Sequence, residues 1–369
     1  MVKIYQAQAK AALKHVVIDH QLDLLIVDNI WSIAMNISAA LALEEVRAEL
    51  ALPAIAHHHD FYWEKTVEPN WNDPFIKGVL DGCMPPKSAE IKHVVINSLA
   101  QASLEKHAGI QAKIVPNVFD FDSPDWEGDS YNNDLREVVG LKKGDICFLQ
   151  ATRIVPRKGI ELAIDLVAAL NEPERRKILM TRDSVNRHPF TSEIKTVLVL
   201  AGYDRDDFTG TYLDRLKVKA EKLDVDLRVI GSIVETVRGQ KNGTKIYSLW
   251  DTYTIADLVT YPSIWEGWGN QLLEALRAKL PIVVFEYPVY LSDIKDESLE
   301  VISLGDEIDE RDKLDLVDIS TEMLQKAADH CLTILTNKQL CEQMVNRNYL
   351  IAKQNYSYEI LENDLESLL

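Results

Sequence analysis

The fold is decided by residues 256–294, which read ADLVTYPSIWEGWGNQLLEALRAKLPIVVFEYPVYLSDI. This stretch joins an apolar strand, residues 258–261, to a loop with two glycines and then to a helix. Gly267 and Gly269 let the backbone turn without the steric penalty of a Cβ atom. We expect Asn270 to cap the helix that follows, NQLLEALRAK. A buried strand, a glycine loop and a helix in this order are typical of a parallel α/β sheet.

Two carboxylates, Glu266 and Glu274, flank this loop, the first within it and the second about one turn into the helix. Free amides at a helix start carry the positive end of the helix dipole and favour a phosphate or another anion. Carboxylates would repel a phosphate, so their suitable partners are hydroxyl groups, which donate hydrogen bonds to ionised oxygens. A sugar nucleotide offers hydroxyls on both sides of its phosphates. The spacing equally allows two solvated acids that favour the helix dipole, and this alternative stays open.

Length and composition predict a globular protein with two domains. The chain has 369 residues, beyond the size of about 250–300 residues at which single cores stop growing, and 47% of them are hydrophobic. Its net charge of −18 argues against nucleic acid or an anionic membrane as the main partner. The four cysteines form no CxxC pair, and no apolar run is long enough for a transmembrane segment. We expect a reduced, cytoplasmic protein without a targeting signal.

Helices and strands alternate along the chain, which indicates two parallel α/β sheets. We place the first domain at residues 1–143, with a polar hinge at 122–143, and the second at 144–369. The segment KILMTR near Met180 is too short to decide between strand and helix. The last helix, YEILENDLESLL, is expected to pack back on one of the domains. The predicted strands are LDLLIVDN, residues 54–56, HVVIN and AKIVPNVFD in the first domain, and ICFLQAT, TVLVLAG, DLRVIGS and residues 258–261 in the second.

Two basic residues, Arg153 and Lys158, flank the turn after the first strand of the second domain, in ATRIVPRKGIE. The carboxyl ends of parallel strands meet at one edge of a sheet. We therefore expect this turn and the EGWGNQ loop to open on the same crevice, where α/β sheets bind ligands. An arginine fork and a lysine charge beside free helix amides suit a diphosphate. A solvated basic turn remains the alternative.

Three consecutive histidines, His57 to His59, and Asp60 close the strand PAIA of the first domain. Neighbouring side chains of a strand point to opposite faces, so the three histidines are not expected to share one ion, and no acid stands at a familiar ligand spacing. We therefore predict no metal site. The preferred interpretation is a histidine at the crevice edge that exchanges a hydrogen bond with a sugar hydroxyl, and a purely structural strand end is the alternative.

The glycine loop also half-matches the dinucleotide-binding fingerprint, with Glu286 after PIVVF in the place of a ribose-binding acid. The third glycine of that fingerprint is replaced by Leu272, which would keep the helix and the strand from packing closely. The first domain offers no such fingerprint. A dinucleotide-dependent enzyme is therefore the weaker interpretation.

Taken together, these motifs resemble family 4 of the retaining glycosyltransferases. The resemblance rests on the two basic residues, on the spacing of the two glutamates around GWGN, and on PNVFDFD before the hinge. It covers most of the chain and is strongest over residues 146–294. It implies the GT-B architecture, in which two Rossmann-like domains face a cleft and the second holds a nucleotide-sugar donor. It also implies metal-independent transfer of a sugar, with retention at the anomeric carbon and without a cofactor, to a small soluble acceptor or glycan.

The resemblance also assigns roles to residues of this chain. Arg153 and Lys158 would contact the diphosphate, Glu274 a ribose hydroxyl, and Glu266 the hydroxyls of the donor sugar. His59 matches the family's histidine after the first-domain strand and would join Arg153, Lys158 and Glu266 in the catalytic group. The other donor contacts would be Gly231 to Ile233 near the base, and Gly267, Trp268, Gly269 and Asn270 at the sugar and phosphate.

The sequence departs from the family pattern in its first residues, where the usual strand and glycine-rich loop are not matched. The first domain is therefore expected to be incomplete, with an exposed sheet edge. Trp268 also replaces the usual Phe. Two other functions stay open, a retaining disaccharide phosphorylase of similar fold and a non-catalytic protein that binds nucleotide or glycan. The choice between a UDP- and a GDP-linked donor, the acceptor and a homodimer are left open as well.

Overall fold

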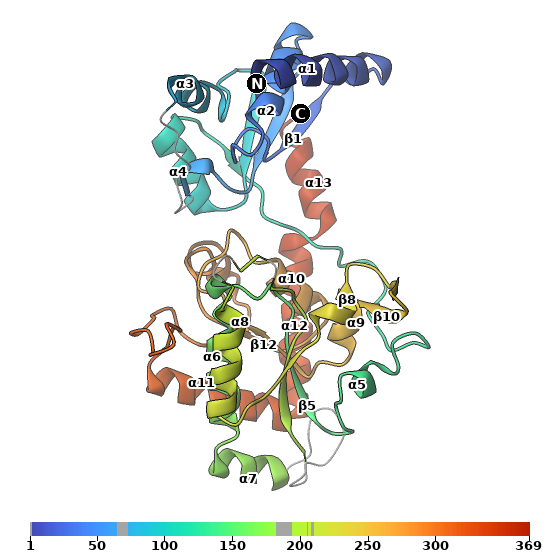
Figure 1. Ribbon diagram of the computed structural model, residues 1–369, viewed down its shortest axis with the longest axis vertical. Helices are drawn as coiled ribbons and strands as arrows, with labels where there is room; N and C mark the ends of the chain where they lie inside the picture. The colour runs from blue at the N-terminus through green and yellow to red at the C-terminus, as the bar shows by residue number, and fades with distance from the viewer. Residues whose placement is uncertain (1, 65–72, 182–193, 205, 208–209) are drawn as a thin grey trace. The chain divides into compact units, whose positions relative to one another are not determined.

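A computed structural model describes residues 2–64, 73–181, 194–204, 206–207 and 210–369 (Figure 1). The chain divides into two compact units, Met1–Asn117 with Glu359–Leu369, and Val118–Tyr358. The main sheet of each unit is parallel, which confirms the predicted α/β fold class. The sequence analysis placed the boundary near Gly144, whereas residues 118–143 group with the second unit.

The first unit contains a four-stranded sheet with the order β1-β2-β3-β4. Its strands are short, the two central ones are largely buried, and Ile26 of the edge strand that comes first in the chain is exposed. They are β1 (Leu25–Asp28), β2 (Ala54–His58), β3 (Ile91–Val95) and β4 (Lys113–Ile114). The helices are α1 (Val2–Asp19), α2 (Ile37–Glu49), α3 (Pro74–Cys83) and α4 (Ser98–Ala108), with a 3₁₀ turn, η1 (Tyr62–Glu64).

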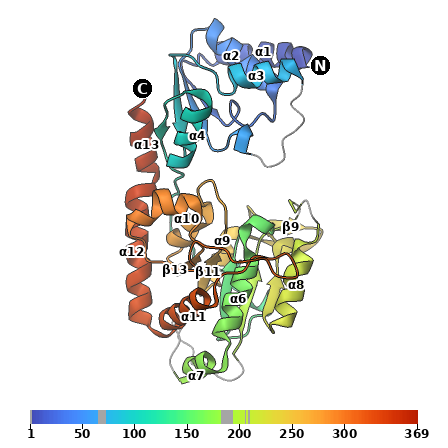
Figure 2. The same ribbon diagram turned by 90° about the vertical axis from the view of Figure 1, so that its left-hand side faces the viewer.

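The two faces of this sheet have separate cores, because alternate strand residues point to opposite sides. On one face Trp31 is completely buried, and its Nε1 donates to the carbonyl of Ala40 (3.1 Å). On the other face the C-terminal segment with α13 (Tyr358–Glu366) packs on the sheet (Figure 2). Its contacts are Leu361, Leu365 and Leu368 against Ile55, Val94 and Val115. The last residues of the chain therefore complete the core of the first unit.

The second unit contains a six-stranded sheet with the order β13-β12-β11-β5-β6-β7. Central strand β5 pairs with β6 on one side and with β11 on the other, so Phe148 lies between Leu198 and Leu258. The strand order reverses between β5 and β11, and such a switch point forms a crevice at the carboxyl ends of the strands. The strands are β5 (Ile146–Gln150), β6 (Thr196–Leu200), β7 (Asp226–Val229), β11 (Leu258–Tyr261), β12 (Ile282–Val284) and β13 (Ile302–Ser303).

The helices of the second unit follow these strands. Residues 177–181 of KILMTR lie in α7 (Pro173–Thr181), which decides the open alternative in favour of a helix, and Arg182 lies outside the described residues. Among the helices of the described ranges, none has both the length and the apolarity to cross a membrane. The other helices are α5 (Leu135–Val138), α6 (Ile160–Leu170), α8 (Tyr212–Lys222), α9 (Leu249–Thr254), α10 (Asn270–Arg277), α11 (Thr321–Thr336) and α12 (Lys338–Tyr356), with the short turns η2 (Pro156–Lys158), η3 (Gly231–Ile233), η4 (Tyr290–Ile294) and η5 (Lys295–Glu297).

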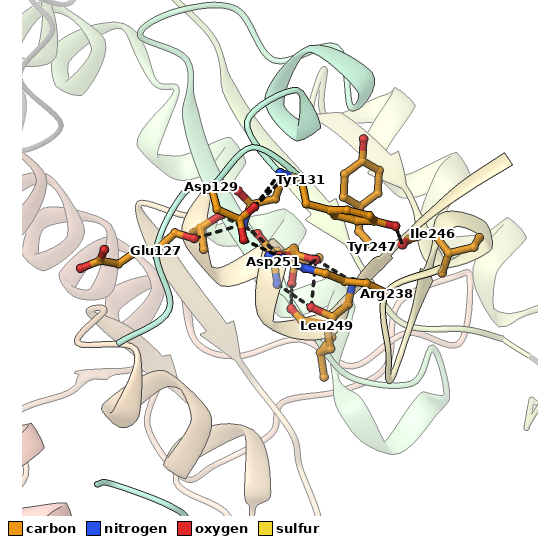
Figure 3. Close-up of polar contacts among 12 residues, drawn as sticks. Glu127, Asp129, Tyr131, Arg238, Ile246, Tyr247, Leu249 and Asp251 are labelled. Atoms are coloured by element: carbon orange, nitrogen blue, oxygen red, sulfur yellow. Dashed lines mark hydrogen bonds and ion pairs between the residues drawn. The ribbon is translucent and has the colours of Figure 1, made fainter. Parts of the chain in front are cut away.

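Polar contacts hold the segment before β5 on the second unit (Figure 3). The hydroxyl of Tyr131 donates to the carbonyl of Ile246 (2.8 Å). Arg238 reaches both Asp129, at 2.6 Å, and the buried Asp251. Asp251 belongs to α9 and Ile246 to a small sheet of β8 (Val234–Glu235), β9 (Gly239–Lys241) and β10 (Thr244–Ser248), and Arg238 lies between β8 and β9. Asp129 and Tyr131, within the region predicted as a hinge, thus contact other elements of the second unit.

Candidate functional site

Two loops meet at the carboxyl edge of the second sheet, one after β5 and one after β11. The amide of Ile264, in the second loop, donates to the carbonyl of Arg157, in the first (3.0 Å). Gly159 has a φ of 55°, and a Cβ atom there would lie 2.3 Å from the carbonyl oxygen of Pro262. Close backbone contact therefore joins the two loops at the switch point of the sheet.

A buried group of charges lies between these loops. Glu266 and Lys158 are each 7% exposed and form an ion pair, and Arg157 NH1 lies 2.7 Å from the Oε2 atom of Glu266. Burial alone would raise the pKa of Glu266, but the positive charges of Lys158 and Arg157 outweigh it and lower that pKa. Burial lowers the pKa of Lys158, and the charge of Glu266 opposes this effect. Glu266 is therefore an ionised, buried residue, and the solvated alternative is wrong for it.

Arg157 lies beside Lys158 in this group, although the sequence analysis did not select it. Arg153 lies elsewhere, with its NH1 2.6 Å from the Oδ2 atom of Asp206, and the two side chains are 42% and 40% exposed. An exposed ion pair contributes about 0–1 kcal/mol, so a ligand can displace it. The diphosphate contact of Arg153 stays a prediction.

The backbone of the second loop requires a glycine just before α10. Gly269 has a φ of 123°, and a Cβ atom there would lie 2.3 Å from the hydroxyl oxygen of Tyr287. That hydroxyl donates to the carbonyl of the buried Trp268 (2.6 Å). Gly269 occupies the N-cap position, and Asn270 is the first residue of the helix. The prediction that Asn270 caps the helix is therefore wrong, because the turn places the glycine there.

Glu274 lies one turn into α10 and is half-buried. Its Oε2 atom accepts a hydrogen bond from the hydroxyl of Tyr253 on α9 (2.6 Å). Burial raises the pKa of this carboxyl, while the Tyr253 bond and the charge of Lys158 oppose the rise. The charge of Lys158 acts on both Glu266 and Glu274. The two carboxylates selected from the sequence thus share one lysine as an electrostatic partner.

The turns after β5, β6 and β7 stack on each other through their backbones. A Cβ atom on Gly231 would lie 2.1 Å from the carbonyl oxygen of Gly202, and one on Gly202 would lie 1.6 Å from that of Thr152. This packing places η3, which contains Gly231 and Ile233, beside the turn after β6, and that turn lies against the one that leads to Arg153. In the sequence, Gly202 can be recognised because Ala201 and Gly202 directly follow the apolar run TVLVL. The contact of Gly202 with Thr152 cannot be recognised there.

His59 belongs to the first unit, and its Nε2 atom lies 3.1 Å from Oδ1 of Asp28. His58 is completely buried, with its Nε2 3.0 Å from Nδ1 of His93. His57 and His59 lie on the same side as Asp28. The strand alternation expected from the sequence therefore separates His58 from its neighbours, but Asp28 joins the other two across the sheet. A contact of His59 with a sugar stays a prediction.

Comparisons with known proteins identify the family. Residues 132–303 match the model described as glycosyl transferases group 1. A mannosylglucosylglycerate synthase from Thermotoga maritima is 38% identical over 343 residues, which cover 93% of this chain and 75% of that protein. The chain belongs to the glycosyl transferases group 1 family. A second mannosylglucosylglycerate synthase, from Petrotoga mobilis, is 44% identical over 284 residues. That match covers 77% of this chain, which spans 64% of the relative's length.

Solved structures agree with a GT-B fold for this group 1 family member. A glycosyltransferase from Rickettsia africae ESF-5 has a TM-score of 0.63 at 14% identity, over 97% of this chain and 79% of that one. WaaG, a glycosyltransferase involved in lipopolysaccharide biosynthesis, has a TM-score of 0.55 at 17% identity, over 89% of this chain and 81% of that one. At these identities the likeness concerns the fold alone.

Proposed function

We propose that this protein transfers a sugar from a nucleotide-sugar donor to a hydroxyl group of a small soluble acceptor. The observation that carries the proposal is the buried pair of Lys158 and Glu266 at the switch point of the second sheet. A buried ion pair is weak evidence for stability, because desolvation offsets its attraction. Charges with shifted pKa values in a crevice instead favour a functional site.

The second unit supplies the groups that a nucleotide sugar needs. Lys158 and the amides at the start of α10 would neutralise the diphosphate, so that this charge needs no metal ion. Glu274 would accept hydrogen bonds from ribose hydroxyls and Glu266 from hydroxyls of the donor sugar. The same proposal includes contacts of Arg153 with the diphosphate, of Gly231 and Ile233 with the base, of Gly267, Trp268, Gly269 and Asn270 with the sugar and phosphate, and of His59 with a sugar hydroxyl.

The proposed reaction retains the configuration at the anomeric carbon. The bond from that carbon to the diphosphate oxygen breaks, and the acceptor oxygen forms a new bond to the carbon on the same face. The leaving diphosphate accepts the proton of the acceptor hydroxyl. Negative charge develops on this leaving group, and positive groups fixed beside it before the reaction lower the barrier.

The two relatives narrow the substrate class. Their shared name describes a product built from mannose, glucose and glycerate. We therefore propose a mannosyl nucleotide as the donor and glucosylglycerate as the acceptor. The base of the nucleotide, uracil or guanine, is left to experiment.

Calorimetric titration of the purified chain with UDP, GDP and ADP tests the donor site. One of them should bind, and Lys158→Met should weaken that binding by about tenfold or more, because a charge-assisted contact is worth about 1.5–3 kcal/mol. Lys217→Met, at an exposed lysine of α8, is the matched control and should change nothing. The absence of binding by all three nucleotides at about 1 mM would refute the donor site. Product formation from each mannosyl nucleotide and glucosylglycerate then tests the transfer, whereas phosphate-dependent release of a sugar 1-phosphate would favour the phosphorylase.

A further inference from the structure

Asp28, His57 and His59 come together at the ends of two neighbouring strands of the first unit. Asp28 and His57 are direct partners in the register of β1 and β2, and His59 follows two residues later. The ring centroids of His57 and His59 are 4.5 Å apart, and Nε2 of His59 lies 3.1 Å from Oδ1 of Asp28. One ligand atom from each of the three residues lies within 4.8 Å of the others.

This spacing suits one divalent cation. With metal–ligand bonds of about 2.0–2.2 Å, the ligand atoms around a tetrahedral ion lie roughly 3.4 Å apart. The separation of at most 4.8 Å between the three atoms closes to that value with small side-chain rotations. Two imidazoles and one carboxylate are a common ligand set for Zn²⁺ and the neighbouring transition metals.

A simple ion pair explains only part of this arrangement. It accounts for the positions of His59 and Asp28 but not for that of His57. The Nε2 atom of His57 is buried and has no hydrogen-bond partner within the described ranges. The ring of His57 also has a hydrogen bond to the backbone of Val115. Histidines that bind metals commonly use one ring nitrogen for such a bond and the other for the ion. An ion between the three residues would give the Nε2 atom of His57 a partner.

The backbone around the three residues is fixed by Asn29. Its Oδ1 atom accepts from the amides of His59 (2.7 Å) and Asp60 (3.3 Å), and its own amide donates to the carbonyl of His57 (2.9 Å). Asn29 has a φ of 59°, a left-handed conformation that asparagine tolerates. The backbone that carries the three side chains is therefore fixed before any ion binds, which lowers the cost of binding one.

We propose that Asp28, His57 and His59 bind a divalent transition-metal cation of the Zn²⁺ class through one carboxylate oxygen and two imidazole nitrogens. Asp28 is exposed and both histidines are partly exposed, so the ion keeps coordination positions for water or another oxygen ligand. The site lies in the first unit and does not depend on the proposed transfer reaction. With an ion bound, Nε2 of His59 faces the metal, so the proposed contact of His59 with a sugar hydroxyl applies to the metal-free protein.

The test uses the full chain without a polyhistidine tag, stripped of metal by a chelator. It is titrated with Zn²⁺ by calorimetry and with Co²⁺ by visible absorbance, and one equivalent should bind. His57→Gln and Asp28→Asn should each weaken this binding by about tenfold or more. His15→Gln is the matched control, because His15 is exposed and its Nε2 lies 3.0 Å from Oδ2 of Asp19 in the same unit. That variant should bind the ions as the parent does.

The proposal is overturned if no ion binds, or if binding is unchanged in both His57→Gln and Asp28→Asn. Circular dichroism shows whether the variants fold. A second measurement uses the unmodified protein, in which Zn²⁺ should slow the acylation of the partly exposed His59 by diethyl pyrocarbonate but not that of the exposed His15. Equal modification with and without Zn²⁺, followed by mass spectrometry of peptides, also overturns it.

Discussion

Replacement of Glu274 by glutamine separates a binding role from a structural one. Glu274 accepts a hydrogen bond from Tyr253 at 2.6 Å, and burial raises the pKa of its carboxyl. A glutamine side-chain oxygen can keep the Tyr253 bond while no charge is buried. We therefore expect Glu274→Gln without ligand to be as stable as the parent at neutral pH, or more stable by up to about 1 kcal/mol.

The pH dependence gives the sign of this effect. The folded-state pKa of Glu274 lies above its ordinary value, so the folded state disfavours the ionised form. The penalty is absent below the ordinary pKa, grows as the pH rises from the ordinary pKa to the folded pKa, and is constant above the folded pKa. The stability advantage of Glu274→Gln should therefore be largest at about pH 8 and vanish at about pH 4.

Nucleotide affinity should change in the opposite direction. If Glu274 accepts hydrogen bonds from ribose hydroxyls, the loss of about 1.5–3 kcal/mol weakens binding of the nucleoside diphosphate by about ten- to a hundredfold. Urea unfolding at both pH values and calorimetric titration measure the two quantities. Tyr253→Phe is the companion variant. It keeps the charge of Glu274 but removes the hydroxyl that donates a hydrogen bond to it, so this variant should be less stable than the parent. A Glu274→Gln protein that is clearly less stable at pH 8 and binds nucleotide normally would refute the reasoning.

Three other substitutions test the frame around the site. Arg277 is fully buried and donates to the carbonyl of Asp120 (3.0 Å) and to Oδ1 of Asp125 (2.9 Å), so Arg277→Met should cost about 3 kcal/mol or more in urea unfolding. Gly231→Ala should lower the melting temperature by several degrees, because its Cβ atom would meet a carbonyl oxygen at 2.1 Å; Gly239→Ala, with nothing within 4 Å, is its control. Gly269→Ala should lower both stability and nucleotide affinity, since its φ is 123°.

The sequence predicted the central strands of the main sheets because these strands are buried on both faces and read as apolar runs, whereas β12 and β13 were not predicted as strands. ICFLQ and TVLVL, for example, are completely buried strands of the second sheet. The small sheet of β8, β9 and β10 was missed because its residues are largely polar and exposed and therefore show no apolar period. The boundary near Gly144 followed from composition, and composition does not reveal the contacts of Tyr131 and Arg238.

The sequence predicted which types of residue form the candidate site better than it predicted which of these residues contact each other. Glycines and carboxylates at fixed offsets indicated the loop, because such backbone geometry restricts the sequence. The choice of Arg157 over Arg153 as the partner of Glu266 depends on the 3₁₀ turn Pro156–Lys158, which spacing alone does not specify. Tyr253 and Tyr287 come from other elements, and their contacts with the loop and α10 are visible only in three dimensions.

The shared core of the first unit limits how the protein can be dissected. Leu361, Leu365 and Leu368 lie far along the chain from the strands that they cover. A truncation at Tyr358 would therefore remove three partly buried leucines from the first unit, at a cost of up to about 1.5–3 kcal/mol for each. A fragment of residues 118–358 keeps the second unit whole, whereas residues 1–117 alone would expose an apolar face. Independent expression of the first unit needs the segment Glu359–Leu369 supplied as well, either fused or as a separate peptide.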